Sequence, residues 1–206
     1  EYITNILGED IIIPTLGLYD KYDDIDFDKL PDQFVIKCTH DSGGIVVVKD
    51  KKKYNIIQAK KTINKCLRRN YYLYSREWPY KNVHPKIIIE KYMEDSNDKE
   101  LRDYKFFVFN GKVKCFKIDF NRFTKHQANY YDRNGDLLMF GETICPPDFK
   151  KKIKMPKKLS CMINYAEKLA INMPFVRIDF YEVNNNVYFG EITFYPASGM
   201  GFFEPS

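Results

Sequence analysis

The chain has 206 residues, a formal net charge of +5 and an aromatic content of 16%, which is the composition of a folded domain and not of a disordered segment. The acids are mixed among the bases, so nucleic acid is not an expected partner, and the scattered cysteines and histidines argue against a zinc site or a disulfide framework. No apolar run approaches the roughly 18 residues of a membrane span, so we expect a cytoplasmic protein.

The first predicted strands follow residues 1–30, which show no clear period and which we interpret as an N-terminal lead-in. Because Glu1 is not an initiator methionine, we expect this lead-in to be truncated. Phe34–Thr39 and Ile45–Lys49 are rich in β-branched residues and flank a polar, glycine-bearing loop at 40–44. This pattern predicts a β-hairpin.

A helix and a strand are predicted next. Ile57–Asn70 has apolar residues near helical spacing among Lys and Arg, which is typical of an amphipathic helix. An aromatic connector, Tyr71–Tyr80, leads to the apolar run Lys86–Met93, which predicts a strand carrying the charges of Glu90 and Lys91 near its end.

The second half of the chain is dominated by hairpin signals. Asn110-Gly111 separates the predicted strands Tyr104–Asn110 and Lys112–Phe120, and Asn129–Met139 carries a further candidate hairpin around residues 133–136. Leu159–Ile171 has the apolar spacing of a helix. The fold class is therefore α+β, with mostly antiparallel sheet.

The last predicted hairpin pairs Val176–Val183 with Val187–Tyr195 around the three asparagines 184–186. With those asparagines as the loop, Asp179 lies directly across from Glu191, and both side chains project from the same face. Facing like charges destabilise a sheet, so the pair needs a cation.

Two cations are candidates for that pair. Arg177, which this register places across from Thr193, is diagonally adjacent to Glu191 and on the same face. Mg²⁺ is the alternative, because it takes one or two carboxylates and leaves its other positions to water and phosphate oxygens. The residues leave the choice open, and a different loop length would break the opposition.

Other polar positions have two interpretations each. The loop Thr39–Gly44 is either a plain turn or a phosphate cradle of backbone N–H groups, and no P-loop or Rossmann motif competes with it. Lys37, in an apolar strand, either reaches solvent or meets a phosphate. Glu90 is a strand-edge charge or a ligand contact, and Asp103 is equally open. Lys105, Lys117 and Arg122 lie on or beside strands whose orientation we cannot assign.

Four segments are informative when they are taken together: LPDQFVIKCTHDSGG, REWPYKNVHPKIIIEKYMED, DYKFFVFNGK and PFVRIDFYEVNNNVYFGEITFYPASG. They resemble the TupA-like ATP-grasp family of bacterial surface-polysaccharide biosynthesis, and the similarity spans nearly all of residues 10–203. The resemblance implies the ATP-grasp fold, in which two subdomains with antiparallel sheets clamp ATP. It divides the chain into the lead-in 1–30, a small subdomain 31–93 and a larger subdomain 94–206.

The resemblance also implies roles for individual residues. Lys37 is expected to hold the α- and β-phosphates under the loop Ser42, Gly43 and Gly44. The adenine hinge is expected at Glu90, Lys91, Tyr92 and Met93, and Asp103 matches the acid that bonds the ribose. The expected metal ligands are Asp179, Glu191 and Thr193, where the superfamily commonly has Asn in place of Thr193, and Arg177 is expected to stabilise the reacting phosphoryl oxygens.

The activity that this resemblance implies is Mg²⁺- and ATP-dependent ligation of a carboxylate to an amine through an acyl phosphate. The carboxylate is expected to be a uronic acid or an amino acid of a capsule or exopolysaccharide, with glycosyltransferases or other pathway enzymes as neighbours. Two alternatives stay open. One is a kinase-like phosphotransferase with His40 or Asp41 as its base. The other is a module that binds carbohydrate or nucleic acid through the aromatic connector.

Overall fold

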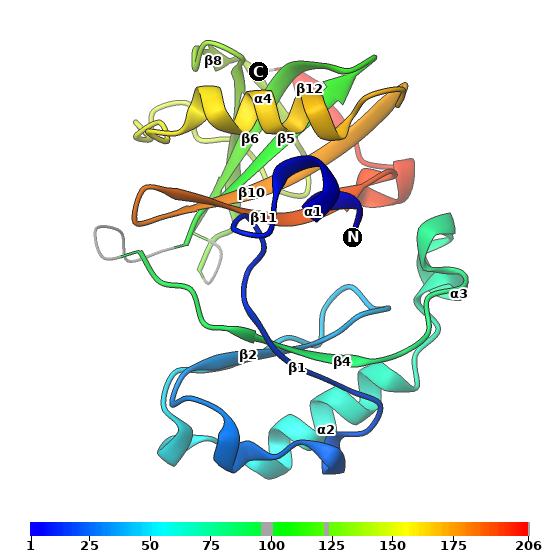
Figure 1. Cartoon of the computed structure of the whole chain (residues 1–206). Coiled ribbons are helices and arrows are strands. Elements are labelled where there is room, and N and C mark those ends of the chain that lie inside the picture. Colours follow the sequence, from blue (N-terminus) through cyan, green and yellow to red (C-terminus); the bar gives the residue numbers. More distant parts are fainter. Residues whose placement is uncertain (96–100, 122–123, 206) are drawn as a thin grey trace. The chain divides into compact units, whose positions relative to one another are not determined.

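The computed structural model describes residues 1–95, 101–121 and 124–205. The chain forms two compact units (Figure 1). The small unit is Ile13–Met93, and the large unit combines Glu1–Ile12 with Glu94–Ser206. No described helix has the length and apolarity that a membrane-crossing segment requires.

The small unit is built on a four-stranded antiparallel sheet. Its order is β1-β4-β2-β3, and the strands are Thr15–Tyr19, Ile87–Lys91, Phe34–Cys38 and Val46–Val48 in that order. The hairpin β2–β3 and the strand β4 confirm the predictions at these positions. Strand β1 lies in the segment without periodicity, and it adds to the sheet beside β4.

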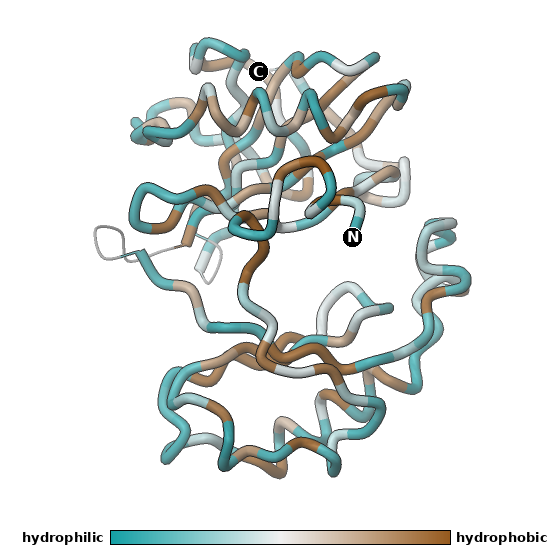
Figure 2. Tube along the Cα trace, viewed as in Figure 1, coloured by the Kyte–Doolittle hydropathy of each residue, from teal (hydrophilic) through white to brown (hydrophobic). Residues whose placement is uncertain are grey.

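One face of this sheet is covered by helix α2, Ile56–Leu67, whose N-cap Asn55 accepts a hydrogen bond from the N–H of Gln58 at 2.9 Å. The alternation along this helix is visible in Figure 2, and its apolar side packs with the alternate residues of β2 and β4 in one core. The aromatic connector contains the short helix α3, Tyr71–Ser75. Four short 3-10 helices complete the unit, at Tyr22–Asp24, Phe27–Lys29, Lys51–Lys53 and Trp78–Tyr80.

The large unit is built on a six-stranded antiparallel sheet of order β11-β10-β5-β6-β7-β8. In chain order the strands are β5 Asp103–Phe109, β6 Lys112–Phe120, β7 Gln127–Asp132, β8 Leu137–Leu138, β10 Phe175–Val183 and β11 Asn186–Thr193. The hairpins at Asn110-Gly111 and at residues 133–136 are confirmed. Both central residues of the first turn have positive φ, which is why Asn-Gly is favoured there.

Helix α4, Leu159–Leu169, lies across one face of this sheet (Figure 1). Its Met162, Ala166 and Leu169 are fully buried against Phe106 and Phe116 of the sheet. Helix α1, Tyr2–Leu7, joins the same unit, because the hydroxyl of Tyr2 donates to the carbonyl of Leu169 at 2.7 Å. Strands β9, Phe140–Glu142, and β12, Phe203–Pro205, form a separate pair, and a 3-10 helix spans Pro196–Gly199.

In the hairpin β10–β11 the predicted three-residue turn is wrong, but the predicted pairing of Asp179 with Glu191 is present. The loop has two residues, Asn184 and Asn185, both with positive φ, and Val183 pairs with Asn186 instead of Val187. A β-bulge at Gly190 then shifts the register by one residue. A Cβ at Gly190 would lie 3.1 Å from the carbonyl oxygen of Asp179, so the bulge requires glycine.

Candidate nucleotide and metal site

The predicted opposition of Asp179 and Glu191 is present, with Arg177 across from Thr193. The loop is one residue shorter than predicted, which shifts the register by one residue, and the bulge at Gly190 shifts it back. The four side chains are therefore brought together on one face of the large unit's sheet, away from α4. Asp179 itself is 1% exposed.

Asp179 is held by two cations. Arg177 Nε donates to Oδ1 at 2.8 Å and Nη2 to Oδ2 at 2.9 Å, and Lys105 Nζ donates to Oδ2 at 2.6 Å. Burial raises the pKa of this carboxyl, but Lys105 and Arg177 outweigh it and hold the pKa below its usual range. Burial lowers the pKa of Lys105, but the carboxylates of Asp179, Asp103 and Asp119 outweigh it and raise that pKa. All three groups are therefore charged at neutral pH.

Three oxygen atoms accept hydrogen bonds from a single atom, Arg177 Nη2. They are Asp179 Oδ2 and Thr193 Oγ1, each at 2.9 Å, and Glu191 Oε1. The Thr193 hydroxyl also lies 3.1 Å from Glu191 Oε1. The side chain of Glu191 is half-exposed, so this convergence point is open to solvent on one side. The guanidinium thus occupies the centre of an oxygen-lined cation site.

This donor set fits Mg²⁺. Two carboxylates and a hydroxyl are hard oxygen ligands, and Mg²⁺ commonly completes its shell with water and phosphate oxygens. The 2.9 Å spacings exceed the Mg–O distance of about 2.0–2.1 Å, so the donors would have to draw inward and the guanidinium would have to leave. No three His, Cys, Asp or Glu residues of the described ranges are arranged to hold a metal by themselves. The site therefore depends on Thr193 and on ligand oxygens.

The charges continue across the sheet as an alternating row. Lys105 lies between Asp179 and Asp119, and Lys117 lies between Asp119 and Glu142, with Lys117 Nζ 2.5 Å from Glu142 Oε2. Every member of this row is at most 9% exposed. We call the described charged side chains of this sheet face the charged face. They are Asp103, Lys105, Lys117, Asp119, Glu142, Arg177, Asp179 and Glu191.

The charged face contains five acids and three bases, so its formal charge is two negative. Asp103 belongs to it, 3.5 Å from Lys105 Nζ and 2% exposed. Asp119 and Glu142 were missed from the sequence. The missed signal is the alternation of charge with aromatic and aliphatic residues along β5 and β6, where a strand buried on both faces normally has apolar residues. Arg122 lies outside the described residues.

In the small unit, Lys37 and Glu90 are brought together on the sheet face opposite α2. Lys37 Nζ lies 2.5 Å from Glu90 Oε2. The strand register places Val35, Val47 and Ile88 on the same face. Val47 is 49% exposed, and none of these three side chains belongs to the described core cluster of the unit, so an apolar surface surrounds the ion pair. Such a surface with one charged pair suits a flat, partly apolar ligand that carries phosphates.

The loop Thr39–Gly44 is anchored at its start and exposed at its tip. His40 Nε2 lies 3.1 Å from the Cys66 carbonyl at the end of α2, and Arg69 pairs with the buried Asp41 at 3.3 Å. Gly44 has φ 61°, and a Cβ there would overlap Cys66 Sγ at 2.1 Å. His40 and Asp41 therefore have structural partners, which disfavours either as a kinase-like base, while Ser42 and Gly43 are exposed.

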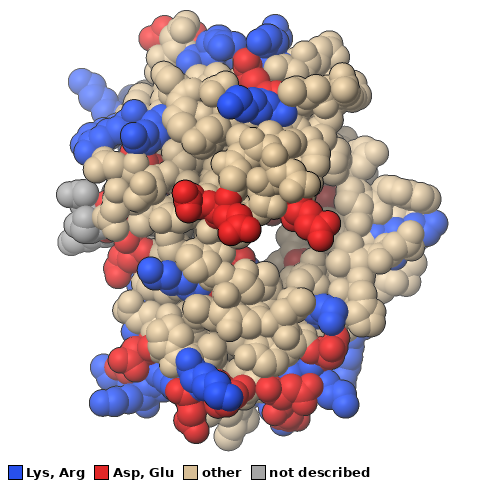
Figure 3. All heavy atoms as spheres, viewed as in Figure 1, with Lys and Arg blue, Asp and Glu red and all other residues tan. Residues whose placement is uncertain are grey.

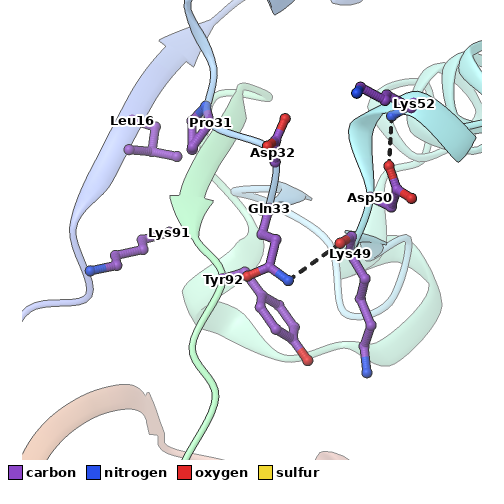
Figure 4. A pocket seen from close by; sticks show the side chains of 9 residues that line it. All are labelled: Leu16, Pro31, Asp32, Gln33, Lys49, Asp50, Lys52, Lys91 and Tyr92. Atoms are coloured by element: carbon purple, nitrogen blue, oxygen red, sulfur yellow. Dashed lines mark hydrogen bonds between the residues drawn. The ribbon is translucent and has the colours of Figure 1, made fainter.

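A pocket of about 840 Å³ in the small unit includes two of the predicted hinge residues, Lys91 and Tyr92 (Figure 4). Lys49 Nζ lies 5.5 Å from the Tyr92 ring centre, and the Gln33 amide donates to the Lys49 carbonyl at 3.3 Å. Leu16, Pro31 and the Tyr92 ring supply an apolar wall. The rest of the lining is polar and mostly charged, with Asp32, Gln33, Lys49, Asp50, Lys52 and Lys91, so an apolar patch is bordered by charges of both signs.

Several aromatic rings of the connector pack against one another or against a neighbouring lysine. Tyr71 contacts Tyr80 with ring centres 4.7 Å apart, and Lys81 Nζ lies 4.2 Å from the Trp78 ring centre. On the face drawn in Figure 3, Lys and Arg are interspersed with Asp and Glu. Neither feature favours the nucleic-acid module, which needs a continuous basic surface with free aromatic faces.

Solved structures similar to this chain show the class of fold. Phosphoribosylamine–glycine ligase from Thermotoga maritima is 12% identical, with a TM-score of 0.51 over 93% of this chain and 46% of that one. N5-carboxyaminoimidazole synthetase from Staphylococcus aureus is 16% identical, with a TM-score of 0.50 over 94% and 41%. D-alanine–D-alanine ligase from Bacillus anthracis is 16% identical, with a TM-score of 0.46 over 93% and 51%, so this chain spans about half the length of such structures.

The two units, each with an antiparallel sheet and helices, define an ATP-grasp protein, and the predicted fold class is confirmed. A search of curated proteins returned no match. The family described as TupA-like ATPgrasp matches residues 1–206, and the chain belongs to that family.

Proposed function

We propose that this chain is an ATP-dependent ligase that joins a carboxylate to an amine through an acyl phosphate. The observation that supports it most is the convergence of Asp179, Glu191 and Thr193 oxygens on Arg177 Nη2. In an ATP-grasp protein, such a convergence point beside a buried row of charges suits the metal and phosphate end of a nucleotide.

The residues predicted from the sequence are the proposed nucleotide contacts. Lys37 would contact the α- and β-phosphates, and Ser42, Gly43 and Gly44 would offer backbone N–H groups to them. Glu90, Lys91, Tyr92 and Met93 would contact the adenine, which the apolar wall beside Tyr92 supports. Asp103, which is buried and lies 3.5 Å from Lys105 Nζ, is the proposed ribose acid.

Mg²⁺ bound by Asp179, Glu191 and Thr193 would neutralise charge on the transferred phosphoryl group. Arg177 would leave the carboxylates when the cation is present and donate to the equatorial phosphoryl oxygens. Lys105, whose Nζ lies 2.6 Å from Asp179 Oδ2, would keep the Asp179 carboxylate ionised. In this mechanism, positioning and electrostatics lower the barrier, and no covalent protein nucleophile is required.

The proposed reaction has two steps. An oxygen of the carboxylate attacks the γ-phosphorus of ATP, and the bond to the β,γ-bridging oxygen breaks to release ADP. The amine nitrogen then attacks the carbonyl carbon of the acyl phosphate, and phosphate leaves as the amide forms. From the family resemblance, we propose a uronic acid or an amino acid of a surface polysaccharide as the carboxylate, with glycosyltransferases among the neighbouring enzymes.

The test is release of ADP and phosphate from Mg-ATP with a panel of carboxylates and amines. D-glucuronate, D-galacturonate, L-alanine and L-glutamate would each be paired with ammonium, glycine and D-glucosamine. We expect release that needs both an acid and an amine and that Asp179→Asn and Glu191→Gln abolish. A phosphorylated product that forms with no amine on a hydroxyl would instead support the kinase-like alternative.

A further inference from the structure

Among the described residues of the charged face, Asp119 is a buried acid whose neighbouring lysines lie no closer than 3.8 Å. Its carboxylate is 2% exposed, and Oδ1 has no hydrogen-bond partner in the described part of the chain. Lys105 and Lys117 are both 3.8 Å away, because Lys105 is drawn to Asp179 at 2.6 Å and Lys117 to Glu142 at 2.5 Å. A buried carboxylate oxygen without a hydrogen bond is costly, so a donor that binds to Oδ1 gains strongly.

A second polar atom in the same place also lacks a partner. Tyr130 on β7 is the strand partner of Lys117 on β6 and is 1% exposed. Its hydroxyl lies near Glu142 but has no hydrogen bond of good geometry among the described residues. The buried row has three acids and two bases, so its net charge is minus one; its members are Asp179, Lys105, Asp119, Lys117 and Glu142. The chemistry complementary to this group is a cationic hydrogen-bond donor.

We propose that Asp119 binds the amine substrate, an inference that rests on the proposed ligase activity. Of the three substrates, ATP and the carboxylate are anions, which Asp119 and Glu142 would repel, and the amine is the one cation. The position is suitable, because a single side chain, Lys105, separates Asp119 from the proposed metal acid Asp179.

His126 gives this group a route to solvent. Its Nε2 lies 3.8 Å from Asp119 Oδ1, its Nδ1 lies 3.4 Å from Cys145 Sγ, and its side chain is 38% exposed. The imidazole thus contacts both Asp119 Oδ1 and solvent, and its rotation is the proposed way in for the amine. His126 can also accept a proton from Asp119 and release it to water.

The chemical step balances as follows. The amine binds as an ammonium ion and gives one proton to Asp119 Oδ1, from which it passes to His126 and to solvent. The freed lone pair forms the bond to the carbonyl carbon, and the bond from that carbon to the phosphate oxygen breaks. The departing phosphate takes the electron pair and the second nitrogen proton.

The experiment separates the two half-reactions in Asp119→Asn. Acyl phosphate formation is followed without amine, as carboxylate-dependent positional isotope exchange in labelled ATP. Amide formation is followed with ammonium chloride, and trapping is followed with hydroxylamine, which is largely neutral at neutral pH and needs no base to free its lone pair. The carboxylate is the panel member that supports exchange in the unchanged protein, and Asp136→Asn, an exposed acid of the same unit, is the control.

We expect Asp119→Asn to keep isotope exchange and hydroxamate formation within about threefold and to lose amide formation by about 100-fold. The control should change neither. Amide formation at the unchanged rate, or a parallel loss of exchange and amide formation, would overturn the assignment. Absence of exchange in the unchanged protein would instead overturn the ligase itself. If Asp119→Asn does not fold, Asp119→Ser with and without added formate replaces it, and failure of formate to restore amide formation counts against the proposal.

Discussion

Arg177 and Asp179, two residues apart on β10, form a bidentate ion pair in which Nε and Nη2 contact Oδ1 and Oδ2 at 2.8 and 2.9 Å. Such pairs combine charge with fixed geometry. Here the pair also fills the point toward which Glu191 and Thr193 are directed. Arg177 therefore acts as the resident cation of the site, and a metal ion must compete with it.

Removal of the guanidinium should raise the affinity for a divalent ion in the absence of nucleotide. In Arg177→Met, Mn²⁺ binding followed by electron paramagnetic resonance should become at least tenfold tighter, since no internal cation competes. The metal-free variant should lose about 3 kcal/mol of unfolding free energy, because buried carboxylates lose a partner, and added Mn²⁺ should restore part of it. Lys114→Met, which removes an exposed cation of β6, is the control. Weaker Mn²⁺ binding in Arg177→Met would contradict the competition.

Lys105 should be essential for stability as well as for the site. Lys105→Met removes the cation that Asp179, Asp103 and Asp119 share, and we expect a loss of about 3–5 kcal/mol in urea unfolding. Lys114→Met, on the neighbouring strand and exposed, should change the unfolding free energy by less than about 0.5 kcal/mol. Equal effects of the two substitutions would show that the buried row is not stabilised in the way described.

Gly190→Ala should disturb the bulge that sets Asp179 opposite Glu191. The new methyl group would lie 3.1 Å from the Asp179 carbonyl oxygen and 3.1 Å from the Tyr181 ring. Relief of the first contact requires the backbone of β10 to move. We expect about 1–3 kcal/mol of destabilisation in thermal unfolding together with weaker Mn²⁺ binding. Asn185→Gly, in the turn of the same hairpin where φ is 65°, should leave both unchanged. A stable Gly190→Ala protein with normal metal binding would refute the role of the bulge.

Glu167 should make stability depend on pH. It joins α4 to the sheet by accepting from Lys112 Nζ at 3.0 Å, Val113 N at 3.2 Å and Arg133 Nη1 at 3.1 Å. Burial raises the pKa of this carboxyl, but these donors outweigh it and lower the pKa below the usual 4.5. Its contribution is therefore present above about pH 4.5 and is lost as the pH falls through the folded-state pKa.

Urea unfolding at two pH values measures that contribution. At pH 7, Glu167→Gln should cost about 1.5 kcal/mol. Near pH 3 the variant and the unchanged protein should approach each other, whereas Glu9→Gln, an exposed acid, should show no difference at either pH. A cost for Glu167→Gln that is the same at pH 3 would exclude the ionic origin.

The hairpins were predictable because their signals are local. Asn-Gly at 110–111 and alternating residues specify strands over a few positions. The opposition of Asp179 and Glu191 was predicted correctly from an incorrect turn, since the bulge at Gly190 depends on close approach of two backbones and leaves no pattern in the sequence. Strand β1 was missed because its partner, β4, is about 70 residues away.

The site was predictable in part for a similar reason. Residues on one hairpin, such as Arg177 and Glu191, are related by register alone. Asp119 and Glu142 join the same face only after β6 and β9 pack in three dimensions, and their charges read locally as ordinary strand-edge polarity. The role of Arg177 as a competitor of the metal also depends on side-chain direction, which register does not specify.

The most direct test of the central claim is the affinity of Mg-ATP, measured by titration calorimetry, in the unchanged protein and in three variants. If Asp179 and Glu191 hold the metal and Lys37 the phosphates, Asp179→Asn, Glu191→Gln and Lys37→Ala should each weaken binding at least tenfold, while Lys114→Met binds normally. Mg-ATP binding that none of the three substitutions alters would contradict the assignment of this site to the nucleotide.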